Sequence, residues 1–176
     1  MQNRLQYLAA VAAFGVLALA PAMAQNTSAN RLGSADNTFA MKAAQGGMAE
    51  VQLGQLAKDH AKSQAVKDFG DRMVTDHTKA NDELKSIASK KGITLPTSID
   101  AKDQATYDRL SKLNGAEFDR AYMADMVKDH QTDVAEFRRE SQTGNDADLK
   151  EFAGKTLPTL QEHLSLAQKT NSEVKK

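Results

Sequence analysis

Cysteine and tryptophan are both absent from this chain of 176 residues. Without cysteine there can be no disulfide, no thiolate metal ligand, no cysteine nucleophile and no bacterial lipid anchor on an N-terminal cysteine. Proline is scarce, and β-branched runs are missing, so little interrupts a helical pattern. The 23 basic residues equal the 23 acidic ones, which argues against nucleic acid as a partner. The sequence also has no nucleophile elbow and no glycine-rich phosphate loop.

A single long apolar run occurs, at the N-terminus, from Leu5 to Ala20. Arg4 precedes it, and Ala22-Met23-Ala24 supplies a small-residue cleavage pattern, so residues 1–24 are predicted to be a secretory signal peptide. The run is shorter than the roughly 20 residues of a spanning helix. We therefore expect a periplasmic protein with no integral membrane span after cleavage. Peripheral association with the envelope stays open, as does the oligomeric state.

The remaining chain predicts four long helices. Residues 25–36 are small and polar and are expected to form a flexible lead-in. Apolar residues then recur at helical spacing, with Gly92 and Gly144 as stop signals. The expected helices span residues 37–60, 63–91, 116–142 and 145–171, followed by a tail at 172–176. Pro158 predicts a kink in the last helix because it removes the hydrogen bond to Gly154.

A connection of more than twenty residues separates the second and third long helices. Asp100 and Asp103 form a capping pattern within it, which predicts a short extra helix. Two helical hairpins joined by such a connection predict an all-α protein, a ferritin-like four-helix bundle with a long crossover. Residues 66–70 and 149–153 are similar to each other, which suggests a duplicated hairpin, whereas the similarity between residues 73–77 and 126–130 pairs other helices and does not fit that scheme.

Three histidines occupy positions where a core residue is expected. His77, His130 and His163 lie on the apolar stripes of three helices, each about fourteen to sixteen residues from the helix start, and Glu50 lies at a similar depth in the first helix. These four side chains should meet near the middle of the bundle. One carboxylate and three imidazoles form a candidate site for a divalent metal ion or copper. His60 lies in a last helical turn and is interpreted as structural or surface-exposed.

The same residues allow other interpretations. The Glu50 carboxylate and the three imidazoles could satisfy one another as a metal-free polar core of a structural or stress-protective protein. Met73 and Met126, one turn before His77 and His130, would suit Cu(I), although methionine at helical spacing usually fills a core. A weaker alternative is an oxidoreductase that uses Tyr122 beside a bound metal. We assign no catalytic residue and no definite cofactor.

Carboxylate-bridged di-iron chemistry is not supported by the spacing of the candidate ligands. Such a site needs Glu-x-x-His pairs, but Val74, Val127 and Leu160 stand three positions before the histidines. The acidic residues directly before each histidine point about 100° away along the helix. They are expected to face solvent or to hold the second ring nitrogen of a histidine on another helix.

The chain resembles the bacterial domain-of-unknown-function family 4142 over roughly residues 38–167. The segments that carry the resemblance are Gly46-Gly47-Met48-Ala49-Glu50-Val51, Met73-Val74-Thr75-Asp76-His77, Gly92-Ile93-Thr94-Leu95-Pro96, Phe118-Asp119-Arg120-Ala121-Tyr122, His130, and Thr156-Leu157-Pro158 with His163. The resemblance implies an exported ferritin-like bundle, often named an outer membrane protein. The family has no established activity, so it implies no particular chemistry.

Overall fold

The computed structural model of the chain describes residues 32–176. The expected signal peptide and most of the expected lead-in lie outside these residues. Residues 32–176 form helices and no β-strand. The helices are α1 (Ser34–His60), α2 (Gln64–Lys91), α3 (Ala101–Leu110), α4 (Gly115–Thr143) and α5 (Ala147–Val174).

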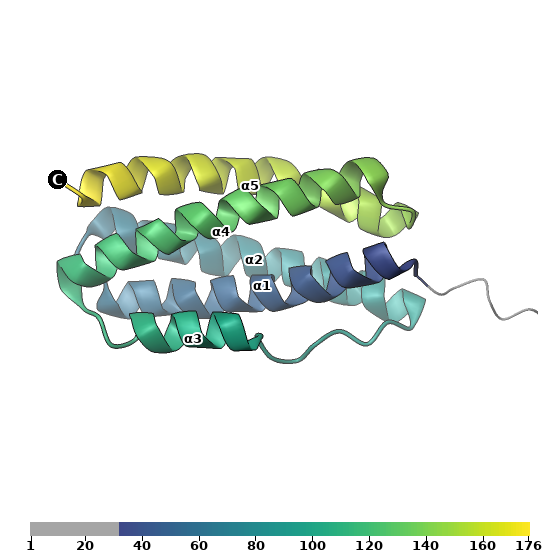
Figure 1. Cartoon of the computed structure of the whole chain (residues 1–176), viewed down its shortest axis with the longest axis horizontal. Helices are drawn as coiled ribbons and strands as arrows, with labels where there is room; N and C mark the ends of the chain where they lie inside the picture. The colour runs from purple at the N-terminus through teal and green to yellow at the C-terminus, as the bar shows by residue number, and fades with distance from the viewer. Residues whose placement is uncertain (1–31) are drawn as a thin grey trace, which may run out of the picture.

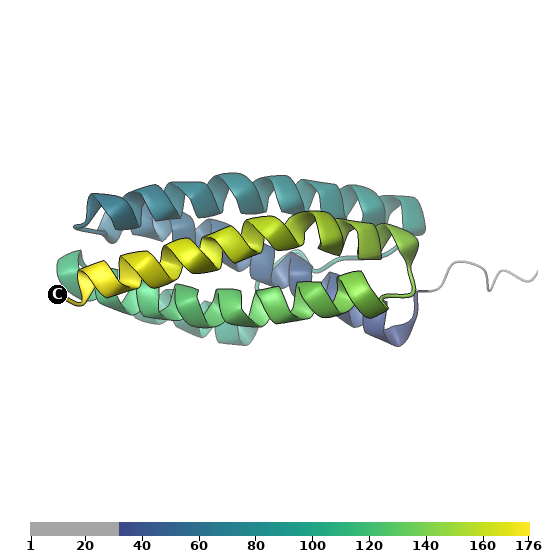
Figure 2. The same ribbon diagram turned by 90° about the horizontal axis from the view of Figure 1, so that it is seen from above.

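The four long helices are arranged as two antiparallel hairpins (Figures 1 and 2). One hairpin is α1 with α2 and the other is α4 with α5, and between them α2 packs against α5 and α1 against α4. The connection from α2 to α4 runs along the bundle and carries α3, which lies beside α1 (Figure 1). This arrangement confirms the all-α, ferritin-like bundle with a long crossover and a short extra helix.

The predicted stop and start signals act at the helix ends. Gly92 ends α2 in the left-handed conformation, at φ 65°, which glycine adopts without a Cβ penalty. The Asp100 carboxylate caps α3 by accepting a hydrogen bond from the backbone N–H of Asp103 at 2.8 Å. Gly144 follows α4, and the Asp146 side chain caps α5.

Some boundaries differ from those expected. Helix α1 begins at Ser34 rather than at residue 37, because buried Asp36 ties its first turn to the α4–α5 turn: the Asp36 carboxylate accepts hydrogen bonds from the backbone N–H groups of Asn145 and Asp146. Helix α5 extends to Val174, so most of the expected tail is helical. It also continues through Pro158 without a break, and the expected bend at this residue stays a prediction.

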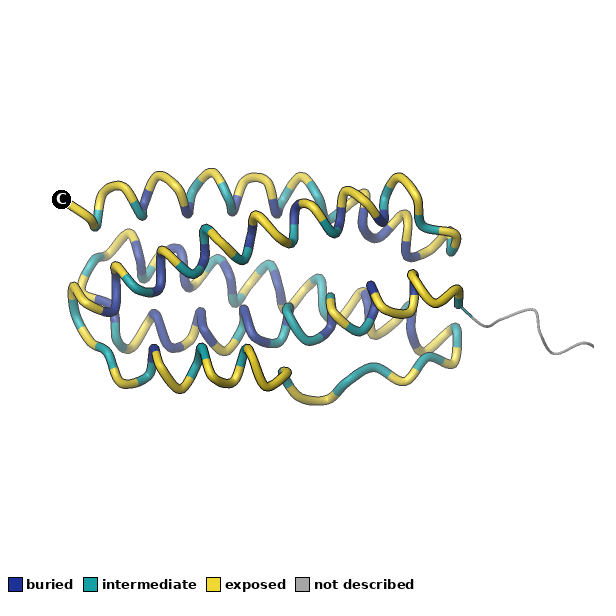
Figure 3. Tube along the Cα trace, in the orientation of Figure 1, coloured by how far each residue is buried: buried dark blue, intermediate teal, exposed yellow. Residues whose placement is uncertain are grey.

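The core consists of two apolar clusters, one toward each end of the bundle, and buried positions face the interior along all four long helices (Figure 3). The first cluster includes Phe69, Phe118 and Tyr122 and lies near the α1–α2 turn. The second is built around Phe39 and Phe152 at the opposite end. Among residues 32–176, none of the helices has the length and apolarity that a membrane crossing requires.

Candidate metal centre

A layer of four buried polar residues separates the two apolar clusters. Glu50, His77, His130 and His163, one from each long helix, are each at most 6% exposed. On every helix the polar residue falls between the residues of the two clusters, for example His77 between Met73 and Leu84. The four polar residues, which lie at similar depths along their helices, therefore lie at one level of the bundle.

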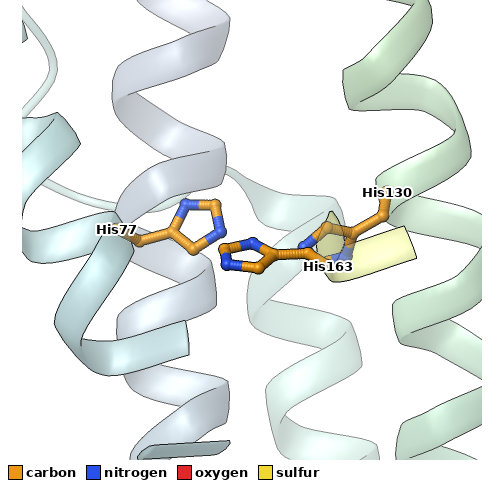
Figure 4. Close-up of side chains that lie close together, drawn as sticks. All are labelled: His77, His130 and His163. Carbon is orange, nitrogen blue, oxygen red and sulfur yellow. The ribbon is translucent and has the colours of Figure 1, made fainter. Parts of the chain in front are cut away.

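The three imidazole rings converge (Figure 4). The ring centre of His163 lies 5.5 Å from that of His77 and 5.4 Å from that of His130, and the centres of His77 and His130 are 5.9 Å apart. One ring nitrogen of each histidine lies within 4.8 Å of the corresponding nitrogens of the other two. A nitrogen–metal bond is about 2.0–2.1 Å long, so small side-chain adjustments would allow all three to reach one ion.

Hydrogen bonds at the outer nitrogens of two rings fix their tautomers. His130 Nδ1 lies 3.0 Å from the carbonyl oxygen of Met126, which can only accept, so Nδ1 carries the proton. His163 Nε2 lies 2.8 Å from Asp76 Oδ2. The remaining nitrogens, His130 Nε2 and His163 Nδ1, are buried without a hydrogen-bond partner, as is Nε2 of His77. Such fixed second nitrogens are typical of histidines that ligate a metal.

Burial keeps the rings neutral, which a metal ligand requires. Burial lowers the pKa of His77 well below its ordinary value, and the neighbouring His130 and His163 lower it further. Burial, assisted by His163, lowers the pKa of His130 to about 4. Burial also lowers the pKa of His163 and outweighs the opposing hydrogen bond to Asp76. At neutral pH the unpartnered nitrogens of His130 and His163 therefore each present a lone pair, and neutral His77 presents one at Nε2 when its Nδ1 carries the proton.

Asp76 is itself held in place. Its Oδ2 accepts a hydrogen bond from Nε of Arg72 at 3.2 Å, and Arg72 in turn donates to exposed Glu162 at 2.6 Å. Partial burial pushes the pKa of Asp76 upward, but the hydrogen bonds from His163 and Arg72 outweigh it and hold that pKa below its ordinary value. An acidic residue that directly precedes one histidine thus holds the ring of another, as the sequence suggested.

Glu50 lies on the other side of His130. Its Oε1 is 3.7 Å from His130 Nδ1, the nitrogen that donates to the Met126 carbonyl oxygen. Its other acidic neighbours are Asp129 and Asp133. Carboxylate oxygens of these three acidic residues lie within 4.8 Å of one another. The structure therefore divides the four predicted ligands into a cluster of three imidazoles and a separate carboxylate.

The other residues singled out in the sequence surround this layer. Met73 and Met126 are buried in the first apolar cluster, where Tyr122 stacks on Phe118 with its hydroxyl unpartnered. Burial raises the pKa of Tyr122 well above its ordinary value, and nearby Glu50 adds to the effect. His60 has a structural contact, since its Nδ1 lies 2.7 Å from the carbonyl oxygen of Leu113.

Sequence reasoning missed a small cavity beside His77. It measures about 30 Å³ and is lined by Gly46, Gly47, Asn81 and Asp133 among others. A space of that size holds about one or two water molecules. The two adjacent glycines of α1 were the available signal, because they leave this part of the helix surface without side chains.

Comparison with solved structures shows three similar bundles. A DUF305 fragment from Deinococcus radiodurans matches with a TM-score of 0.71 and 12% identity, covering 81% of this chain and 98% of that one. A DUF305 protein of Streptomyces coelicolor, which carries the name of a secreted protein, matches with a TM-score of 0.68 and 13% identity, covering 80% and 94%. CopM in its Cu(I)-bound form matches with a TM-score of 0.65 and 13% identity, covering 78% and 96%.

At these identities the likeness concerns the fold alone. No curated protein matches the sequence. A family model matches residues 20–170, and that span contains the whole layer of three histidines and Glu50. On that match, the chain belongs to the family described as a domain of unknown function, DUF4142.

Proposed function

We propose that this protein is a copper-binding module of the bacterial envelope, in which His77, His130 and His163 hold one Cu(I) ion. The observation that carries the proposal is the set of three buried, neutral imidazoles, each with a ring nitrogen that has no partner. Buried polar atoms in native proteins normally have partners, so three orphans around one point indicate a missing ligand. An ion that accepts a lone pair from each would satisfy them.

The donor set favours copper among the metals that bind imidazole. Imidazole suits zinc, copper, iron and nickel, whereas calcium and magnesium prefer oxygen. Zinc bound by three imidazoles takes a fourth ligand, often a water molecule, whereas this buried cluster offers three nitrogens. Cu(I) accepts three ligands, and a monovalent ion costs less to bury than a divalent one because the desolvation cost rises with charge. The similarity in fold to a protein solved with bound Cu(I) supports the same choice.

An envelope location rests on the predicted signal peptide at residues 1–24. Support comes from the structural similarity to a protein named as secreted. The lack of cysteine fits an exported copper protein, because no thiol is present for copper to oxidise. N-terminal sequencing of the protein recovered from the periplasm tests the location, and a chain that begins at Gln25 is expected. A mature chain that still begins at Met1 would contradict export.

The copper site is tested by titrating the untagged protein with Cu(I), without oxygen, against a colorimetric Cu(I) chelator. We expect one tightly bound ion per chain. His77→Gln and His163→Gln should each weaken binding by at least about tenfold, since a ligand nitrogen is lost. His60→Gln, which changes a histidine that lies outside the cluster, should bind as the wild type does. Equal binding by all four proteins would overturn the assignment.

The competing interpretation is a metal-free polar layer. A ligand that binds only the folded state raises its stability in proportion to the logarithm of the ligand concentration over Kd. Under the copper proposal, Cu(I) should raise the melting temperature of the wild type and leave that of His163→Gln nearly unchanged. Under the polar-layer interpretation, neither Cu(I) nor Zn²⁺ should move the melting temperature of either protein.

A further inference from the structure

Glu50 is a buried carboxylate that the copper proposal leaves unexplained. Its side chain is fully buried, and both of its oxygens lack a hydrogen-bond partner. The unpartnered nitrogen of His130 is Nε2, whereas the nitrogen 3.7 Å from Glu50 Oε1 is Nδ1, which donates to the Met126 carbonyl oxygen. Copper on the three histidines would therefore leave the Glu50 oxygens as they are. A buried carboxylate without partners calls for a separate explanation.

Two more carboxylates are aimed at the same place. Asp129 and Asp133 are four residues apart on α4, so they lie on one face of that helix. Each is partly buried, and each offers an oxygen within 4.8 Å of a Glu50 oxygen and of the other's. Glu50 reaches them from α1, which packs against α4.

We propose that Glu50, Asp129 and Asp133 form a second cation site, which takes a divalent ion that prefers oxygen ligands, of the Mn²⁺ or Ca²⁺ class. Carboxylate oxygens are the preferred ligands of these ions. A divalent ion would give both Glu50 oxygens a partner. It would also neutralise two of the three negative charges that the helices bring together.

Without a cation the ionisation of Glu50 and Asp133 is disfavoured. Burial raises the pKa of Glu50 well above its ordinary value, and Asp129 and Asp133 raise it further. Burial, assisted by Asp129, likewise raises the pKa of Asp133. A bound divalent ion reverses this effect because it favours the ionised form of each carboxyl group.

An ion can reach the site from the protein surface. Asp129 lines a surface cleft between α3 and α4, together with Asp103 and Asp125. Asp133 lines the small cavity that His77 also lines. Lys102 and Lys128 also line the cleft, so its aspartates leave it with a small net negative charge, which favours entry of a cation.

The second site does not depend on the copper proposal. Its three ligands are all oxygen donors and include none of the histidines, so the two sites can fail separately. Loss of Mn²⁺ binding on changing His163, which belongs to the imidazole cluster and not to the carboxylate group, would mean that one mixed site exists. That result would overturn the inference.

The probe is Mn²⁺, added to metal-free protein and followed by electron paramagnetic resonance, in which the signal of the hydrated ion diminishes on binding. We expect one Mn²⁺ per chain, displaced by Ca²⁺. Glu50→Gln and Asp133→Asn should each weaken binding by at least about tenfold, because a charged ligand is lost. Glu50→Gln replaces a buried carboxyl by an amide of the same shape, and circular dichroism checks that it folds.

Asp125→Asn is the matched control. Asp125 lies on α4 and lines the same cleft as Asp129, but it is not one of the three clustered carboxylates. Its variant should bind Mn²⁺ as the wild type does, and so should His163→Gln. Failure of the wild type to bind Mn²⁺ would overturn the site and indicate carboxyl groups that hold protons instead of an ion. Equal loss of binding in Asp125→Asn and Glu50→Gln would overturn it too, and would indicate non-specific electrostatic attraction of Mn²⁺ to the acidic surface.

Discussion

The Asp76 carboxylate on α2 lies 2.8 Å from Nε2 of His163 on α5. This contact joins the two hairpins at the level of the three imidazoles. It also sets the proton on the outer nitrogen of His163 and leaves the inner one, Nδ1, without a partner. Asp76 is therefore a positioning residue for the candidate metal centre, and it touches no metal itself.

Replacing Asp76 by asparagine should weaken Cu(I) binding without removing it. The amide can still accept a hydrogen bond from His163, but it lacks the charge that orients the ring and raises its basicity. Mutation of such outer partners typically costs about 10–100-fold in metal affinity. Chelator competition measures the change. Unaltered affinity in Asp76→Asn would show that the carboxylate does not support the site.

Glu162→Gln provides the comparison for that variant. Glu162 is exposed and pairs with the same arginine, Arg72, but it makes no hydrogen bond to a histidine. An exposed ion pair contributes only about 0–1 kcal/mol to stability. Glu162→Gln should therefore bind Cu(I) as the wild type does, and a loss as large as that in Asp76→Asn would point to general charge rather than to the contact with His163.

Much of this architecture could be predicted from the sequence because it depends on local patterns. The apolar stripes placed His77, His130 and His163 on inward faces, and the equal depths along the helices placed them at one level. Gly92, Asp100 and Gly144 marked helix ends by conformational preferences that act within a few residues.

The division between Glu50 and the histidines could not be predicted in this way. Helical spacing determines on which face of its helix a side chain lies and at what height. It does not determine which side chains of the neighbouring helices, each about 10 Å in diameter, it will contact. Glu50 approaches the outer nitrogen of His130 because α1 packs against α4, while α2 packs against α5. The start of α1 was misplaced for the same reason, since Asp36 finds its partners in a distant turn.

The contribution of His130 to the stability of the metal-free protein should fall on acidification from about pH 6.5 to about pH 4. The pKa of His130 falls from 6.5 to about 4 on folding. Below pH 6.5 His130 becomes protonated in the unfolded chain but stays neutral in the folded protein. Its contribution to stability is therefore complete above pH 6.5 and decreases as the pH falls to about 4. The contribution is on the order of 3 kcal/mol.

Comparison with His130→Gln isolates this contribution. Glu50 has the opposite effect on stability. Its pKa is raised in the folded state, so the folded protein binds this proton more strongly than the unfolded chain does and gains stability as the pH falls. Urea unfolding of both proteins with a chelator present, at several pH values, gives the difference. Between pH 4 and pH 6.5, the free energy of unfolding of the wild type should increase with pH relative to that of the variant. A difference that does not change with pH would contradict the assignment.

Two glycines of the first hairpin should respond oppositely to alanine. A Cβ on Gly70 would lie 2.8 Å from both the Gly54 carbonyl oxygen and the Ala57 Cβ, so the helices approach too closely for a side chain. Gly70→Ala should cost about 1–3 kcal/mol. A Cβ on Gly46 would meet nothing within 4 Å, so Gly46→Ala should stabilise the helix by up to about 1 kcal/mol. Urea unfolding measures both, and equal effects would contradict the close approach.

Two buried aspartates hold the turns of opposite hairpins. Asp36 on α1 accepts from the backbone N–H groups of Asn145 and Asp146, and Asp119 on α4 accepts from those of Lys62 and Ser63. Donors and acceptors are related by one spacing of 83 residues (36 to 119, 62 to 145, 63 to 146). The same spacing relates the similar segments that begin at residues 66 and 149, as a duplicated hairpin requires.

Because the two contacts are equivalent, Asp36→Ala and Asp119→Ala should destabilise the protein to a similar extent. Each leaves two backbone N–H groups without their acceptor, which costs about 1–3 kcal/mol. The double variant should lose the sum of the two, since the contacts lie at opposite ends of the bundle and distant sites add. Asp108→Ala, an exposed residue, is the control and should change the free energy of unfolding by less than about 0.5 kcal/mol. A large effect in one aspartate variant and none in the other would show that the two turns are not held alike.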